Sequence, residues 1–142
     1  MKERGRAVME MLWRISSHWS VRWVHAVVVG TVGTLLVIFF LNGMLSVETL
    51  PGCLPWVVAF NGAMAAFMLV DRTGGQLKHP RQWSVAAGAA VGALSHVLAN
   101  TLFAYLHGMP LLGTRSALVC VAVAALSGLG GGVLAIKAKA AR

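Results

Sequence analysis

The segment WVHAVVVGTVGTLLVIFFLNGMLSV, residues 23–47, contains no aspartate, glutamate, lysine or arginine. Residues 49–70 and 82–114 share this property. Each run is long enough to cross a hydrocarbon core about 30 Å thick, which requires about 20 helical residues. Of the 142 residues, 58% are hydrophobic and only 11% are charged, and the mean hydropathy is +0.76. The composition therefore indicates an integral membrane protein rather than a soluble domain.

The hydropathy pattern predicts an all-α membrane bundle of four transmembrane helices. We place these helices at residues 23–44, 54–70, 84–107 and 116–136, within one transmembrane domain that covers residues 23–136. Residues 137–142 form a basic tail. Residues 1–22 are also basic, and their apolar residues recur at roughly helical spacing. This N-terminal segment is therefore either an amphipathic helix on the membrane surface or a flexible tail.

Lysine and arginine are distributed unequally between the two sides of the predicted helices. The N-terminal segment, the second connection and the C-terminal tail hold eleven of the twelve: Lys2, Arg4, Arg6, Arg14, Arg22, Arg72, Lys78, Arg81, Lys137, Lys139 and Arg142. The two opposite connections hold only Arg115. Cytoplasmic flanks are enriched in such residues, so we expect both termini to be cytoplasmic, in a bacterial inner membrane. Trp23 and Trp83 then fall at the inner interface and Trp56 at the outer one.

The net charge of +8 is explained by this topology. The cations are spread over three membrane-flanking segments rather than gathered with aromatic residues on one soluble face. We therefore expect no nucleic-acid partner. The predicted partner of the basic ends is the anionic inner leaflet of the lipid bilayer.

Similar pentapeptides end the first and third predicted helices. Residues 40–44 read FLNGM and residues 105–109 read YLHGM. Gly43 and Gly108 are each placed to adopt the left-handed conformation that ends a helix. The match indicates either two helical hairpins related as parallel repeats or a coincidence in a chain rich in leucine, glycine and methionine.

Small residues recur at a spacing of about four in every predicted helix. Such residues let helix backbones approach where lipid provides no hydrophobic drive for association. We predict helix packing at Gly30, Gly33, Gly62, Gly88, Gly92, Gly128 and Gly132. These faces pack either within one chain or between copies, because four short helices bury little surface and a homo-oligomer is expected.

The third predicted helix carries a partly polar face. His96 falls near the middle of the membrane, Asn100 and Asn61 lie at similar depth, and Asn42 lies nearer the outer surface. An ionisable residue inside a membrane indicates a functional site by default. The alternative is structural, with a neutral imidazole hydrogen-bonded to Asn61, Asn100 or Ser95.

Catalytic and cofactor motifs are missing from the sequence. We find no nucleophile with a base, no phosphate-binding loop and no metal-ligand cluster, so we predict no enzymatic activity, no metal and no cofactor. His25, His96 and His107 lie at three different depths, which excludes a two-histidine haem site within one chain but not between chains. Cys53 and Cys120 both lie toward the outer side, and we expect two thiols, with a disulfide as the alternative.

Two functions fit these features. In the first, copies of the chain assemble into a pore or transporter for an ion or small solute, lined by His96, Asn100 and Asn61. In the second, the chain is a non-catalytic accessory, anchoring or immunity-type subunit of a larger membrane complex. Similar hydrophobic bundles serve both purposes, so the fold class does not choose between them.

Overall fold

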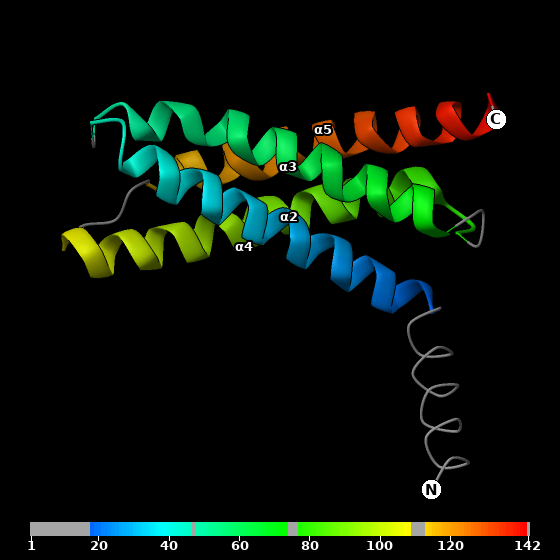
Figure 1. Cartoon of the computed structure of the whole chain (residues 1–142), viewed down its shortest axis with the longest axis horizontal. Coiled ribbons are helices and arrows are strands. Elements are labelled where there is room, and N and C mark those ends of the chain that lie inside the picture. Colours follow the sequence, from blue (N-terminus) through cyan, green and yellow to red (C-terminus); the bar gives the residue numbers. More distant parts are fainter. Residues whose placement is uncertain (1–17, 47, 74–76, 109–112, 142) are drawn as a thin grey trace, which may run out of the picture.

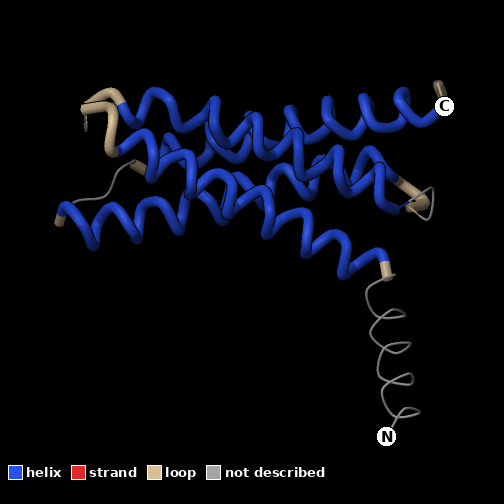
Figure 2. The backbone as a smooth tube through the Cα atoms, in the orientation of Figure 1, coloured by secondary structure: helices blue, strands red, loops and turns tan. Residues whose placement is uncertain are grey.

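The computed structural model describes residues 18–46, 48–73, 77–108 and 113–141, and these residues form four helices. They are α2 (Trp19–Asn42), α3 (Leu50–Thr73), α4 (Pro80–His107) and α5 (Thr114–Ala140), and they lie alongside one another (Figure 1). Figure 2 shows only helices and connecting loops in this part of the chain. Each helix is long and apolar enough to cross a membrane. The predicted all-α bundle of four membrane-spanning helices is confirmed, whereas most of the N-terminal segment 1–22 and Arg142 lie outside the described residues.

The helices are longer than the hydropathy pattern predicted. α2 begins at Trp19 instead of residue 23, α3 begins at Leu50 instead of residue 54, and α5 continues to Ala140 instead of residue 136. Hydropathy marks the part of a helix that lies in hydrocarbon, whereas the terminal turns extend into the headgroup region and carry charges. Pro55 is tolerated within α3 because it lies near the start, where it removes one backbone hydrogen bond.

The two central helices are α3 and α4, which contact each other and both outer helices. In the described residues α2 and α5 do not contact each other. Helices α2 and α4 run in one direction and α3 and α5 in the other, as the colour sequence in Figure 1 shows. α5 makes its contacts with both α3 and α4, and its packing therefore fixes how the two central helices are spaced.

Glycine allows the backbone of α5 to approach α3 and α4 directly. A Cβ on Gly92 would lie 3.0 Å from the Cys120 carbonyl oxygen, and one on Gly128 would lie 2.6 Å from the Ser84 carbonyl oxygen. A Cβ on Gly88 would overlap the Ala124 carbonyl. A side chain at Gly88 or Gly128 would push the helices apart, and one at Gly92 would require its neighbours to shift by a few tenths of an ångström.

The remaining glycines that the sequence singled out also face a neighbouring helix. A Cβ on Gly62 of α3 would lie 3.1 Å from the Ala124 carbonyl oxygen of α5, and Gly132 faces the Ser84 side chain. In α2, a Cβ on Gly30 would lie 2.9 Å from Val91 and one on Gly33 would lie 2.6 Å from Oδ1 of Asn61. Small residues therefore lie at the contacts among all four helices.

The two pentapeptides end their helices differently. Gly108 has φ 73° and its N–H donates to the carbonyl of Ala104, so it adopts the predicted left-handed conformation. The prediction is wrong for Gly43, whose φ of −79° is right-handed. Here the chain continues in a right-handed turn, in which the N–H groups of Met44 and Leu45 both reach the Leu41 carbonyl. The Leu41 carbonyl therefore has hydrogen-bond donors without a left-handed residue at Gly43.

Basic residues gather at one end of the bundle, where α2 and α4 begin and α3 and α5 end (Figure 1). We call this the basic end, and its described members are Arg22, Arg72, Lys78, Arg81, Lys137 and Lys139. Trp83 packs there against Trp19, with ring centroids 4.5 Å apart, and against Trp23 at 6.4 Å. That the basic end faces the cytoplasm remains a prediction from the charges.

Replacing Gly131 by alanine should destabilise the bundle. A Cβ at Gly131 would overlap the backbone of Ala63, whereas one at the neighbouring Gly130 would meet nothing within 4 Å. Gly131→Ala should lower the free energy of unfolding by about 1–3 kcal/mol through overpacking. Gly130→Ala, the matched control, should leave it within about 1 kcal/mol of wild type. Denaturation of the purified protein in detergent measures both, and equal stabilities would contradict this packing.

Thiol labelling should report the topology and the packing together. Cys53 lies half-buried in the first turn of α3, away from the basic end, and Cys120 is buried in α5. In intact cells, a membrane-impermeant maleimide should label Cys53 and spare Cys120. Labelling of Cys53 only after the cells are opened would reverse the predicted orientation.

Candidate functional site

The buried face of α4 points into the bundle, and a polar pair lies at its edge. The buried residues recur every three or four positions and are Ser84, Ala87, Gly88, Val91, Gly92, Ser95, Ala99 and Phe103. Gly92 faces Cys120, Val121 and Ala124 of α5. His96 lies one helical turn beyond Gly92 and is half-buried, which places it at the α5 side of this face.

His96 is hydrogen-bonded to Asn100 of the same helix. Nδ2 of Asn100 lies 3.0 Å from Nε2 of His96. An amide NH₂ group donates, so Nε2 accepts and the neutral ring carries its proton on Nδ1. Nδ1 is buried and has no hydrogen-bond partner among the described residues. A buried donor without a partner costs about 1–3 kcal/mol, so this N–H requires a partner from outside the described chain.

Asn61, which the sequence placed at the depth of His96, and Asn42, which it placed nearer the outer surface, both lie away from His96. Asn61 lies between α3 and α2, because its Oδ1 approaches Gly33 and its amide donates to the Val57 carbonyl at 2.9 Å. Asn42 lines a cleft of only about 20 Å³ between α2 and α4, beside Phe103. The structure therefore brings His96 and Asn100 together and assigns Asn61 and Asn42 to the α2 side.

Hydroxyl groups lie in the middle of the bundle, and sequence reasoning named Ser95 among them but overlooked Thr31 and Thr34. Gly30 of α2 faces Val91 of α4, and these two helices run parallel. Thr34 follows Gly30 by one turn and Ser95 follows Val91 by one turn, so the two hydroxyl groups lie at the same level of the bundle. Thr34 donates to the Gly30 carbonyl at 2.9 Å. The hydroxyls of Thr31 and Ser95 are buried and have no partner in the described part of the chain. No motif distinguishes these residues, because threonine and serine are common in membrane helices.

The larger clefts lie at the basic end. One of about 380 Å³ is lined by Val21, Arg22, His25 and Arg72, and another of about 310 Å³ is formed by residues 78–82. Sequence reasoning counted Arg22 and Arg72 only as topological signals. Arg22 precedes the first predicted helix and Arg72 follows the second, so both lie at the same end of neighbouring helices. This shared position could have predicted that the two residues line one cleft.

The described residues show neither a metal-binding cluster nor a disulfide. Across residues 18–46, 48–73, 77–108 and 113–141, no group of three His, Cys, Asp or Glu side chains is placed to hold a metal ion. Cys53 and Cys120 are free thiols. The His107 ring packs against Phe103, with centroids 4.3 Å apart.

Comparison with known proteins yields no relative. No protein-family description, no curated protein and no solved structure matches the chain. The function therefore has to be argued from the residues of this chain.

Removing the Ser95 hydroxyl should not weaken the isolated bundle. Its Oγ is buried without a partner among the described residues, whereas Oγ of Ser84 donates to the Pro80 carbonyl at 2.7 Å. Ser95→Ala should leave the free energy of unfolding unchanged or raise it by about 1 kcal/mol. Ser84→Ala, the control, should lower it by about 1 kcal/mol. Denaturation in detergent compares them, and marked destabilisation by Ser95→Ala would reveal a partner for that hydroxyl.

Proposed function

We propose that copies of this protein associate along the edge formed by α4 and α5 and form a path for an ion or small polar solute across the membrane. The observation that carries this proposal is the buried Nδ1 atom of His96, which has no partner among the described residues. Because Nε2 accepts from Asn100, we assign the ring proton to Nδ1. In hydrocarbon, only water, a solute or another protein can satisfy that donor. A water-filled path between copies supplies such a partner once the edge opens enough for water to reach Nδ1, which the single chain covers.

Close helix packing favours a path between chains over one within a chain. The contacts of Gly62 and Gly92 with α5 bring backbones to about van der Waals distance in the centre of the bundle. The interior clusters there consist of apolar residues such as Val58, Ala99 and Ala124. A single bundle of this kind leaves little room for a polar solute.

The chemistry of the path follows from the residues available to line it. The spans carry charged side chains only in their terminal turns. His96 and Asn100 offer neutral donors and acceptors, which suit a small polar solute, a monovalent ion or a proton passed by the imidazole. We propose no catalytic step, and we place the protein in a bacterial inner membrane with cytoplasmic termini.

Transport should be measured with the purified chain in liposomes. Proton flux under a clamped potential, potassium flux and swelling with urea or glycerol together cover the proposed classes. At least one should exceed the rate in protein-free vesicles. His96→Leu should return that flux to background, because leucine removes both ring nitrogens. Val97→Leu is the matched control at an exposed neighbouring position and should retain the flux.

Absence of flux in every assay, with cellular function preserved in His96→Leu, would contradict the proposal. Recovery of a second membrane protein in stoichiometric amount from gentle detergent would then support the alternative. In that case the chain would be an accessory, anchoring or immunity-type subunit, and His96 would meet a group of its partner.

A further inference from the structure

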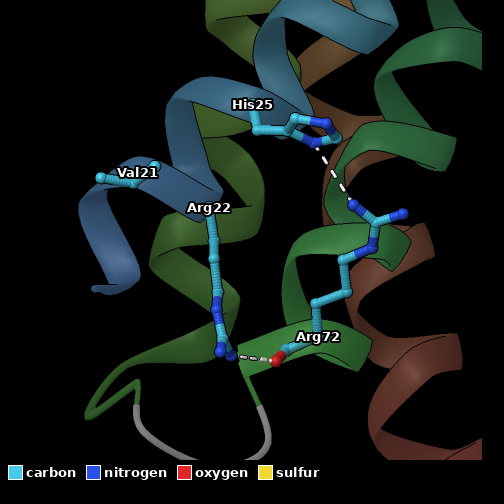
Figure 3. Close-up of a pocket in the computed structure, with 4 residues that line it drawn as sticks. All are labelled: Val21, Arg22, His25 and Arg72. Carbon is cyan, nitrogen blue, oxygen red and sulfur yellow. Dashed lines mark hydrogen bonds between the residues drawn. The ribbon is translucent and has the colours of Figure 1, made fainter. Parts of the chain in front are cut away.

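A cationic groove opens between α2 and α3 at the basic end. It is lined by Val21, Arg22, His25 and Arg72 and holds about 380 Å³ (Figure 3). Arg22 is the fourth residue of α2, about 5 Å along the helix from its first residue. Arg72 is the penultimate residue of α3. Both charges therefore lie at the level where a membrane-spanning helix meets the lipid headgroups.

The groove is organised by hydrogen bonds across the two helices. The Arg22 guanidinium donates to the Arg72 carbonyl, and Nη1 of Arg72 lies 3.3 Å from Nδ1 of His25. Figure 3 shows the two arginine side chains extending in opposite directions along the groove. A guanidinium can only donate, so Nδ1 of His25 accepts and the proton of the neutral ring is on Nε2. The remaining guanidinium N–H groups and the His25 Nε2–H are donors for an anion.

No carboxylate neutralises these cations within the described part of the chain. Asp71 is the only described acidic residue at this end, and no ion pair joins it to Arg22 or Arg72. Its backbone carbonyl accepts a hydrogen bond from Lys139 at 3.0 Å. Arg22 and Lys139 are thus held by backbone carbonyls at the carboxyl end of α3, whereas Arg72 meets the neutral ring of His25, so these contacts offset only part of the positive charge.

Exposed apolar side chains continue from the groove toward the centre of the membrane. Val29 follows His25 by one helical turn and is 41% exposed, and Leu36 lies further along the same side and is 65% exposed. On α3, Met64 precedes Arg72 by two turns and is 45% exposed. The cationic groove is therefore followed, along the line where α2 meets α3, by a row of exposed apolar side chains.

We propose that this groove binds the phosphate of one anionic phospholipid of the inner leaflet. The guanidinium of Arg72, which lies beside the His25 ring, donates to the phosphate oxygens, since arginine suits planar, charge-assisted phosphate recognition. Arg22, whose guanidinium lies at the opposite end of the groove, adds attraction through its charge. The His25 Nε2–H supplies a further donor, and an acyl chain lies along Val29, Leu36 and Met64. This site does not depend on whether the protein conducts a solute.

A second basic cleft provides the control. Lys78 and Arg81 lie in the cleft formed by residues 78–82 at the same end, so they have similar charge and similar distance from the membrane. That cleft comes from one short segment and does not lie on the α2–α3 seam. Arg81→Gln therefore removes one positive charge from the basic end while leaving the proposed site intact.

Lipid binding should be measured on the full chain in neutral detergent by native mass spectrometry, with dioleoyl phosphatidylglycerol as the probe. One tightly bound lipid per chain is expected, and dioleoyl phosphatidylcholine should bind more weakly. Arg22→Gln and Arg72→Gln should each weaken binding about fivefold, the change expected for one cation near the surface. Arg81→Gln should weaken it less than about twofold if the site is local. Arg72→Lys retains the charge and should bind better than Arg72→Gln.

Three results would overturn the proposal. Equal weakening by Arg81→Gln and Arg72→Gln would indicate diffuse attraction to the basic end rather than a site. Displacement of the lipid by millimolar inorganic phosphate would indicate a site for a free phosphate anion. Equal binding by Arg72→Lys and Arg72→Gln, or equal affinity for the two lipids, would show that positive charge at Arg72 does not recognise the headgroup.

Discussion

The close approach of α5 to α3 and α4 is the contact on which the rest of the structure depends. A bilayer provides no hydrophobic force between helices, so association rests on van der Waals contact and on hydrogen bonds. Glycines at positions 88, 92, 128 and 131 let backbone meet backbone, and every such contact excludes a side chain. The centre of the bundle is consequently filled by backbone and small apolar groups. Among polar groups it holds small hydroxyls such as those of Thr31 and Ser95, whereas the His96 imidazole and the cationic side chains lie at the edges.

This constraint explains where the two candidate sites lie. His96 and Asn100 share the half-buried edge of α4 next to α5, because Gly88 and Gly92 occupy the adjoining face of α4, where it meets α5. Arg22, His25 and Arg72 occupy the opposite side of the molecule, where α2 packs on α3 and does not reach α5. The α2–α3 contact is close at Gly30 and Gly33, in the middle of α2. It opens into a groove at the basic end, where long side chains replace glycine.

Sequence patterns predicted the depth of a residue along its helix better than they predicted which neighbouring helix the residue faces. Hydropathy located the four helices and underestimated their ends, because charged terminal turns such as that of Arg72 leave the hydrocarbon while remaining helical. The pairing of His96 with Asn100 follows from their spacing of four residues. Asn61 lies at a similar depth and yet faces Gly33, since depth does not determine which neighbour a helix presents. The Gly43 conformation depended on the turn after it, which a matching pentapeptide does not specify.

The two histidines illustrate how location decides what a free N–H group implies. Arg72 fixes the proton of His25 on Nε2, and Asn100 fixes that of His96 on Nδ1, so each neutral ring has one donor left. At the membrane surface water can satisfy the His25 donor, and an anion there competes with water. The His96 donor is buried in the central part of a membrane-spanning helix, where bulk water is absent. An unpaired N–H at that depth costs more than one at the surface, so of the two histidines His96 is the one that requires a partner beyond the described residues.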